Sequence, residues 1–176
     1  MSRYRRAGIN GGVFFFTVTL ADRSSDLLVQ HVDRLRRVYA LVQQRHPFKT
    51  IAICVLNDHL HALWSLPPGD ADFPMRWSLI KSSFSRGLAT VSLRSNSQIA
   101  KRDKGIWQRR YWEHAIRNSA DLDRHIDYIH FNPVKHRYVS RACDRPHSSF
   151  HRFVERGILP QDWGGDVSDI PGAFGE

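Results

Sequence analysis

Two histidines separated by one residue are the first feature of this sequence that could do chemistry. His59 and His61 stand in the stretch NDHLHALW, inside an otherwise apolar run. In a β-strand, side chains alternate between faces, so both imidazoles would share one face while Leu60 and Ala62 occupy the other. Two imidazole nitrogens held side by side on a strand make half of a metal site, although the same spacing by itself is also typical of structural histidines.

A tyrosine and an asparagine further along the chain supply two more reactive groups. Tyr128 and Asn132 lie four residues apart in SADLDRHIDYIHFNPVKH, a spacing that makes them neighbours on a helix. Pro133 disfavours helical geometry at the residue before it, which predicts Asn132 at or just beyond the helix end. The spacing predicts a buried stripe of Leu122, Ile126 and Ile129. His125, Tyr128 and Asn132 follow at steps of three and four on another face of the helix.

Together these groups suggest cleavage of a phosphodiester by a tyrosine nucleophile beside a divalent cation. Such a cation neutralises charge on the phosphate oxygens as a Lewis acid. His59, His61 and Asn132 would hold it and leave coordination positions open, with Mg²⁺ or Mn²⁺ as the expected ion. A phenol, whose ordinary pKa is about 10, needs the cation or a base to favour its phenolate. A covalent phosphotyrosine would conserve the phosphodiester energy, so the strand could be rejoined.

These groups need a sheet and a helix to position them, and the apolar pattern predicts both. The predicted strands are residues 13–20, residues 48–56, the run that carries the two histidines, and residues 112–117. Asn57 and Asp58 tolerate the backbone geometry of a two-residue hairpin turn, so the histidine strand should pair antiparallel with the strand before it.

The helices and the order of the elements predict the fold. The predicted helices are residues 26–46, residues 73–88 and residues 119 to about 132. In the second helix, the spacing predicts that Phe73, Trp77, Ile80, Phe84 and Leu88 face inward and that Arg76, Lys81 and Arg86 lie elsewhere on its surface. Residues 92–104 show no periodicity and are predicted to form a loop. We expect a single α+β domain of the ferredoxin-like (split βαβ) type, an antiparallel sheet with helices on one face and the other face open for a ligand.

Charge points to a polyanionic partner. The 176-residue chain has 26 basic and 17 acidic residues, a net charge of +9. Residues 161–176 contain four acids and no Lys or Arg, so residues 1–160 carry +13. We therefore expect one domain at residues 1–160 and an acidic tail at residues 161–176 that competes with DNA for the basic face. A solvated basic surface without a ligand explains the charge nearly as well as nucleic-acid binding does.

Composition also argues against several classes of protein. Cys54 and Cys143 are the two cysteines, which gives no basis for a disulfide framework or a thiolate metal cluster. No apolar stretch is long enough to span a bilayer, and the basic start lacks the apolar segment of a secretory signal. The sequence therefore predicts a cytoplasmic protein without a membrane partner.

The motifs resemble those of a known family. HLHALW is similar to the HUH motif (His, hydrophobic, His) of single-tyrosine DNA transposases, and IWQRRYWEHAIR together with HIDYIHFNPVKH resembles the REP-associated tyrosine transposases, which act on repetitive extragenic palindromes. The resemblance implies an HUH endonuclease-type fold and a metal-dependent DNA endonuclease and strand transferase. His59 and His61 would be metal ligands, and Tyr128, on a C-terminal helix, would form a 5′-phosphotyrosine. Asn132 stands where the insertion-sequence relatives have a glutamine.

Several basic residues are candidate contacts to single-stranded or hairpin DNA. They are Arg3, Arg5, Arg6, Arg109, Arg110 and Lys135. Arg109 and Arg110 adjoin Trp107 and Tyr111, so phosphate neutralisation and base stacking could occur together. We assign His114 and Glu113 a structural role.

Two other functions remain open from the sequence. A non-catalytic regulator that binds single-stranded or hairpin DNA could use the same sheet, basic charge and aromatic residues. A metal phosphodiesterase that uses activated water would need the histidines but not the tyrosine. The oligomeric state is either a monomer or a homodimer, and the short connection between the last strand and the tyrosine helix favours a monomer with a self-contained site.

Overall fold

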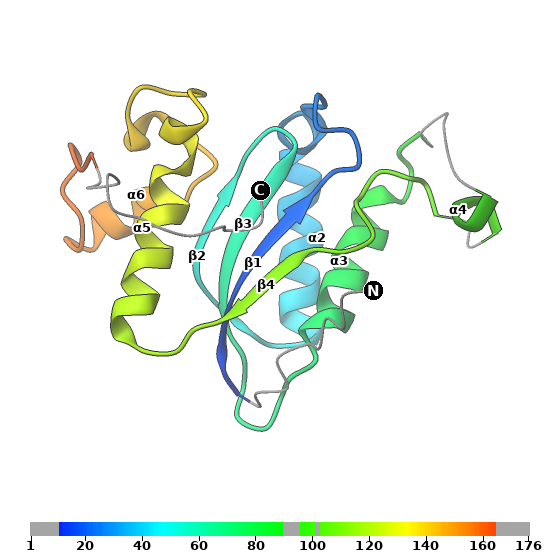
Figure 1. Cartoon of the computed structure of the whole chain (residues 1–176), viewed down its shortest axis with the longest axis horizontal. Coiled ribbons are helices and arrows are strands. Elements are labelled where there is room, and N and C mark those ends of the chain that lie inside the picture. Colours follow the sequence, from blue (N-terminus) through cyan, green and yellow to red (C-terminus); the bar gives the residue numbers. More distant parts are fainter. Residues whose placement is uncertain (1–10, 90–95, 101–102, 165–176) are drawn as a thin grey trace, which may run out of the picture.

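The computed structural model describes residues 11–89, 96–100 and 103–164, which fold around a four-stranded antiparallel sheet (Figure 1). The strands are β1 (Val13–Thr19), β2 (Lys49–Val55), β3 (His59–Ser65) and β4 (Trp112–Ala115). Their order is β2-β3-β1-β4, and each neighbouring pair runs antiparallel. This confirms the predicted ferredoxin-like α+β topology, including the hairpin that joins β2 to the histidine strand.

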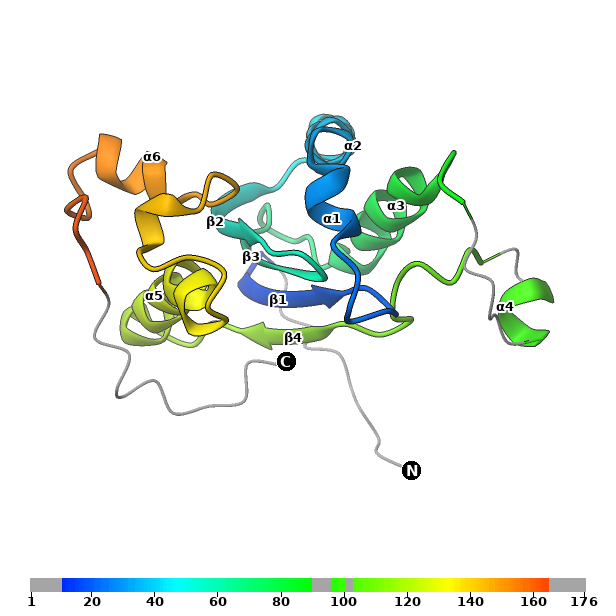
Figure 2. The same cartoon turned by 90° about the horizontal axis from the view of Figure 1, so that it is seen from above.

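The helices occupy both sides of this sheet. They are α1 (Leu27–Gln30), α2 (Val32–Arg45), α3 (Phe73–Ser85), α4 (Asn96–Ala100), α5 (Ser119–Lys135) and α6 (Phe150–Glu155), with a 3-10 turn, η1 (Ala142–Asp144). The helix predicted at residues 26–46 is divided at His31 into α1 and α2. Within the predicted loop, residues 96–100 form α4, which stands apart from the sheet in Figure 2, and residues 92–95 and 101–102 lie outside the described residues.

The main core lies between the sheet and helices α2 and α3. Alternation along β1 and β3 turns one set of side chains toward these helices, namely Phe14, Phe16, Val18, Leu60, Ala62 and Trp64. Trp64 stacks on Trp77 of α3, with ring centroids 4.3 Å apart. The four inward residues predicted within α3 are buried: Phe73, Trp77, Ile80 and Phe84.

Arg76 is predicted to lie on the outer surface of α3, but it is buried, with only 3% of its surface exposed. Its Nη1 donates to Asp70 Oδ1 at 3.0 Å, and its Nε donates to the carbonyl oxygen of His46 at 3.0 Å. A guanidinium can be buried where a carboxylate and backbone carbonyls accept its hydrogen bonds. These acceptors lie outside the helix, so helical periodicity does not reveal them.

The second face of the sheet is not open as predicted, because α5 packs across part of it. Figure 1 shows the sheet between α5 on one side and helices α2 and α3 on the other. Ile129 of α5 joins Phe15 of β1 and Leu63 of β3 in a second apolar cluster. The buried side of α5 also includes His125, Tyr128 and Asn132, whereas Leu122 and Ile126 are only partly buried. Of the three residues in the predicted buried stripe, only Ile129 is fully buried, and the face with His125, Tyr128 and Asn132 also lies against the sheet.

The end of α5 also differs from the prediction, because the helix continues through Pro133 to Lys135. Arg137 adopts a left-handed conformation with φ of 59°. The N–H of Tyr138 donates to the carbonyl of Pro133 at 3.0 Å, and the N–H of Arg137 donates to that of Val134 at 2.9 Å. These two bonds form a Schellman motif. They close the last turn beyond the proline, so Asn132 stays helical.

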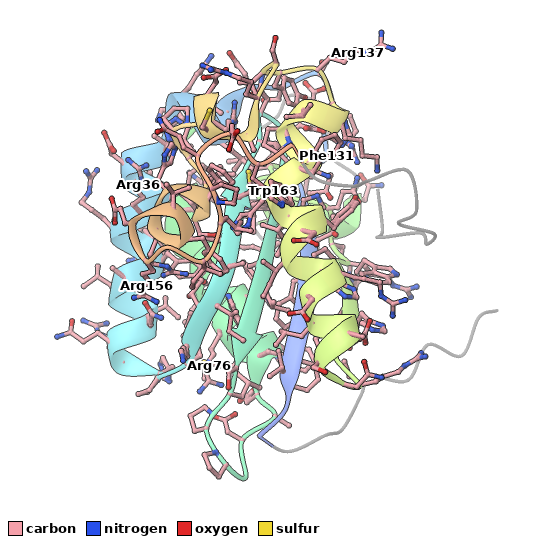
Figure 3. All side chains as sticks on the ribbon, turned by 90° about the vertical axis from the view of Figure 1, so that its left-hand side faces the viewer. Arg36, Arg76, Phe131, Arg137, Arg156 and Trp163 are labelled. Carbon is pink, nitrogen blue, oxygen red and sulfur yellow. The ribbon has the colours of Figure 1, made fainter. Side chains whose placement is uncertain are left out.

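The segment after α5 folds back on the edge of the sheet. Backbone hydrogen bonds join Val55 and Ile53 of β2 to His147 and Ser149. His130 of α5 is fully buried, and its Nε2 lies 2.9 Å from Ser149 Oγ. Figure 3 shows Trp163 between α5 and α6 in this region. Residues 161–164 of the acidic tail are described, and residues 165–176 lie outside the described residues.

Within the described ranges, no helix combines the length and the apolar character that crossing a bilayer requires.

The first prediction concerns stability in mild acid. Burial, and secondly the charge of Arg152, lower the pKa of His130 from 6.5 to about 3. The unfolded chain therefore binds a proton that the folded chain excludes, and stability present above pH 6.5 is lost as pH falls toward 3. We expect His130 to contribute a loss of about 1.4 kcal/mol per pH unit below 6.5.

Urea unfolding at pH 7.5 and pH 5.5 measures this effect. The difference in unfolding free energy between the two pH values should shrink in a His130→Gln chain, which cannot take up that proton. An equal difference in both proteins would contradict the assignment to His130.

Candidate active site

The two histidines of β3 lie on the sheet face covered by α5. Both are buried, and their ring centroids are 4.9 Å apart with the planes nearly perpendicular, at 81°. Thr19 and Thr17 of β1 are their cross-strand partners. The predicted placement of His59 and His61 on one face is confirmed, because β3 begins at His59 directly after the turn and alternates regularly from there.

His59 is oriented by its neighbour Asp58. Its Nδ1–H donates to Asp58 Oδ1 at 2.8 Å, and Arg23 pairs with the other carboxylate oxygen at 2.5 Å. Burial alone would raise the pKa of Asp58, but the hydrogen bond from His59 and the charge of Arg23 hold that pKa below its usual value. With Nδ1 protonated, Nε2 carries the lone pair, and this buried atom has no hydrogen-bond partner among the described residues. A carboxylate behind an imidazole is the usual support for a metal-binding histidine.

His61 joins β1 to the tyrosine helix. Its Nδ1 lies 3.0 Å from the hydroxyl oxygen of Thr17, and its ring stacks on Phe15. The ring of Tyr128 meets His61 nearly edge-on, with centroids 5.2 Å apart. The imidazole pair and the predicted nucleophile therefore share one buried interface between β3 and α5.

The C-terminal half of α5 completes the site. Asn132 is 0% exposed on the buried face of the helix, one turn beyond Tyr128. The ammonium of Lys135 donates to Tyr128 Oη at 3.4 Å and lies 5.0 Å from the centre of that ring. His136, the C-cap residue, places its ring centroid 5.2 Å from that of His59. Sequence reasoning missed His136, although its spacing of four from Asn132 continues the same helix face.

The other residues predicted to contact DNA do not gather at this site. Arg109 and Arg110 are exposed on the segment that leads into β4, and Arg3, Arg5 and Arg6 lie outside the described residues. Trp107 is only 6% exposed and packs edge-on against Phe84, with ring centroids 5.4 Å apart. Trp107 is therefore part of the core rather than an exposed stacking surface for bases.

A second group of histidines lies at the other end of α5. The ligand atoms of His114, Asp121 and His125 lie within 4.8 Å of one another, so this group could hold a metal ion. Asp121 Oδ2 accepts hydrogen bonds from His114 Nε2 at 2.9 Å and from the backbone N–H of Arg117 at 3.0 Å. Burial would raise the pKa of Asp121, but these hydrogen bonds lower it to about 2. The network ties β4 to α5, in keeping with the structural role predicted for His114.

The sheet is ferredoxin-like, and its His-x-His strand faces a tyrosine on a later helix. This arrangement is that of the HUH-type tyrosine transposases, the class that the sequence motifs resemble.

No protein-family model matches the chain. A REP-associated tyrosine transposase of Escherichia coli is 46% identical over 170 residues, which cover 97% of this chain and 95% of that protein. A Haemophilus influenzae protein assigned to the same family is 46% identical over 167 residues, 94% of this chain and 95% of the relative.

A comparison with solved structures points to the same family. The structure of a REP-associated tyrosine transposase bound to a REP hairpin matches this chain with a TM-score of 0.87 and 46% identity, covering 100% of this chain and 98% of the other. The chain belongs to the family of REP-associated tyrosine transposases, and it is therefore a homologue of the tyrosine transposases, which are enzymes. The resemblance inferred from the motifs is confirmed.

The second prediction tests how α5 is held to β4. In an Asp121→Ala chain, the His114 imidazole and the N–H of Arg117 lose their acceptor in a buried place. We expect the unfolding free energy to fall by about 2–3 kcal/mol, measured by urea denaturation. Asp123→Ala, at an exposed position on the same helix, is the matched control and should change it by less than about 0.5 kcal/mol. Equal losses in the two variants would refute the structural role of Asp121.

Proposed function

We propose that this protein cleaves and rejoins single-stranded DNA at repetitive extragenic palindrome hairpins through a 5′-phosphotyrosine at Tyr128. The observation that supports this most directly is the contact between His61 and Tyr128, whose ring centroids are 5.2 Å apart. It brings the groups expected to hold a cation next to the group expected to attack. The relative that was solved with a REP hairpin supports the choice of substrate.

His59, His61 and Asn132 are the residues that we propose hold a divalent cation, Mg²⁺ or Mn²⁺. The donor set fits, because the buried Nε2 of His59 has no hydrogen-bond partner among the described residues and its Nδ1–H is fixed by Asp58. Imidazole nitrogens with an amide oxygen suit Mn²⁺ somewhat better, whereas Mg²⁺ prefers oxygen ligands throughout. When bound, the cation would neutralise charge on the scissile phosphate.

Tyr128 supplies the nucleophile in this proposal. Its Oη forms a bond to phosphorus while the bond from phosphorus to the 3′ oxygen breaks, so the phenol loses a proton and the 3′ oxygen gains one. The number of phosphate ester bonds is unchanged, which makes the step reversible. Lys135, whose ammonium donates to Oη at 3.4 Å, favours the phenolate and afterwards lies next to the phosphate attached to Tyr128.

Basic residues outside this centre would position the DNA. We propose Arg109, Arg110 and Lys135, together with Arg3, Arg5 and Arg6, as contacts to phosphates. Binding should therefore weaken steeply as salt is added. We also propose that residues 1–160 act as one domain and as a monomer, because His61 and Tyr128 meet within a single chain.

The third prediction separates this enzyme from a non-catalytic regulator. A Tyr128→Phe chain should form no covalent adduct with a hairpin oligonucleotide in the presence of Mn²⁺, yet should bind the hairpin as tightly as the unchanged protein. Adducts are resolved on a denaturing gel, and binding is followed by fluorescence anisotropy. Tyr138→Phe, at an exposed tyrosine, is the control and should keep the adduct.

Three outcomes decide between the alternatives. Adducts that persist without the Tyr128 hydroxyl would mean that another residue attacks. Cleavage without any adduct in the unchanged protein would indicate a phosphodiesterase that uses activated water. Binding without cleavage under all metal conditions would favour the regulator.

The fourth prediction tests the cation site without requiring activity. Asp58→Ala removes the acceptor that orients His59, and the affinity for Mn²⁺, measured by calorimetry in the absence of DNA, should fall about 10- to 100-fold. Asp22→Ala, a nearby carboxylate bonded to Ser24, should leave the affinity unchanged. If His114→Gln weakens Mn²⁺ binding while Asp58→Ala does not, the ion belongs to the His114, Asp121 and His125 group instead.

A further inference from the structure

Lys81 of α3 is a partly buried lysine whose amine is held in place by another segment of the chain. Its Nζ donates to the carbonyl of Gln108 at 2.6 Å. The same atom lies 5.9 Å from the ring centres of Trp107 and of Tyr111. All three partners belong to the segment of residues 103–111 that leads into β4, which runs beside α3 in Figure 1. The amine is therefore fixed in position, unlike that of a lysine on a solvated surface.

This environment makes the amine of Lys81 a better nucleophile than that of an ordinary lysine. Burial lowers its pKa from 10.5 to about 8, because removal from water disfavours the charged ammonium, and the charge of Asp103 opposes this only in part. At pH 7.5 about one quarter of the Lys81 side chains then carry a neutral amine, compared with about one in a thousand for an ordinary lysine. Only the neutral amine has the electron pair that attacks an electrophile. It can keep one N–H on the Gln108 carbonyl while that pair points elsewhere.

The cavity that Lys81 lines is suited to a phosphate group. Its volume is about 1120 Å³. The other described residues that line it include three cations and one acid, namely Arg86, Lys104, Arg109 and Asp103. Ser78 and Ser85 stand three residues before and four residues after Lys81, so their hydroxyls line the same face of α3. Cations and hydroxyls of these kinds bind phosphate oxygens in proteins. A small phosphate compound held here would lie near a nucleophilic amine.

We propose that Lys81 is a modification site that accepts the acyl group of a small acyl phosphate bound in this cavity. Such a compound combines the phosphate that the cations bind with a carbonyl carbon that an amine attacks. The electron pair of Nζ forms a bond to the carbonyl carbon, the bond from that carbon to the phosphate oxygen breaks, and inorganic phosphate leaves with the electron pair. Nζ loses one proton to solvent, and the product is a neutral amide. This reaction is independent of the DNA chemistry proposed for Tyr128.

Acylation would change the charge of the cavity but not its covalent framework. An amide carries no positive charge, so the attraction of Nζ to the rings of Trp107 and Tyr111 is lost. The remaining N–H can still donate to the carbonyl of Gln108. The modification thus removes one cation from the cavity and leaves the side chain in place.

Acetyl phosphate is the probe for the reaction, and the full folded chain is the sample. The protein is incubated with acetyl phosphate at pH 7.5 without DNA, and the acetylated fraction of each lysine is followed by mass spectrometry of its peptides. Lys49, an exposed lysine of β2, is the internal reference. The larger neutral fraction of Lys81 outweighs the lower nucleophilicity of a less basic amine, so Lys81 should react about 20-fold faster than Lys49. In urea, where the chain is unfolded, the two rates should be similar.

Two matched double variants test whether the cavity binds the phosphate. Arg86→Gln with Arg109→Gln removes two exposed cations that line it, and Arg37→Gln with Arg156→Gln removes the same charge from exposed positions outside it. The first pair should slow the acetylation of Lys81 by acetyl phosphate about 10-fold, because the phosphate loses two charged partners. The second pair should leave that rate unchanged. With 4-nitrophenyl acetate, which has no phosphate, the three proteins should acetylate Lys81 equally fast.

Three results would overturn the proposal. Equal rates at Lys81 and Lys49 in the folded protein would show that the held amine has no special reactivity. The same rate with acetyl phosphate in both double variants would show that the cavity cations do not bind the phosphate. An equal loss with acetyl phosphate and with 4-nitrophenyl acetate in the first pair would mean that the arginines act on the amine instead of on the phosphate.

Discussion

The candidate site depends on one packing contact, that of α5 against the sheet face that carries the two histidines. Apolar side chains such as Phe15, Leu63 and Ile129 make this contact along one part of the interface. Burial of apolar surface contributes about 25 cal/mol per Å² and is non-directional. It therefore stabilises the packing of α5 on the sheet without fixing the rotation of the helix about its axis. The ring of Tyr128 meets that of His61 nearly edge-on across this interface, a contact that depends on the orientation of the helix.

Hydrogen bonds at both ends of α5 set its position along the sheet. At the start, Asn118 accepts from the N–H of Asp121 at 2.9 Å, and Asp121 binds His114 of β4. At the end, the Schellman motif around Arg137 stops the helix at the level of His59. The carbonyl end of a helix carries a partial negative charge of about half an electron, which favours a cation nearby. The same local structure that ends the helix thus suits the charge proposed for the site.

Most of the fold and part of the site could be predicted from the sequence. The strands, the hairpin and the shared face of His59 and His61 follow from alternation, which is a local property of the chain. The errors at Arg76, Trp107 and α5 have a common cause, since in each case the partner that decides burial lies in another element. Pro133 is a local error of a different kind, because the left-handed Arg137 restores the turn that the proline was expected to end.

The group of His114, Asp121 and His125 and the pair of His59 and His61 both lie beside α5, but they differ in the hydrogen-bond partners that the protein gives them. Asp121 accepts hydrogen bonds from two donors, and the rings of His114 and His125 stack almost parallel, at 11°. Ring nitrogens bind metals in the plane of the ring, so parallel stacked rings do not converge on one ion without turning. His59 and His61 are nearly perpendicular, and the buried Nε2 of His59 finds no partner in the described part of the chain. Burying such an atom costs free energy unless a ligand uses it, which supports the proposal that the cation binds at β3 rather than at the group of His114, Asp121 and His125.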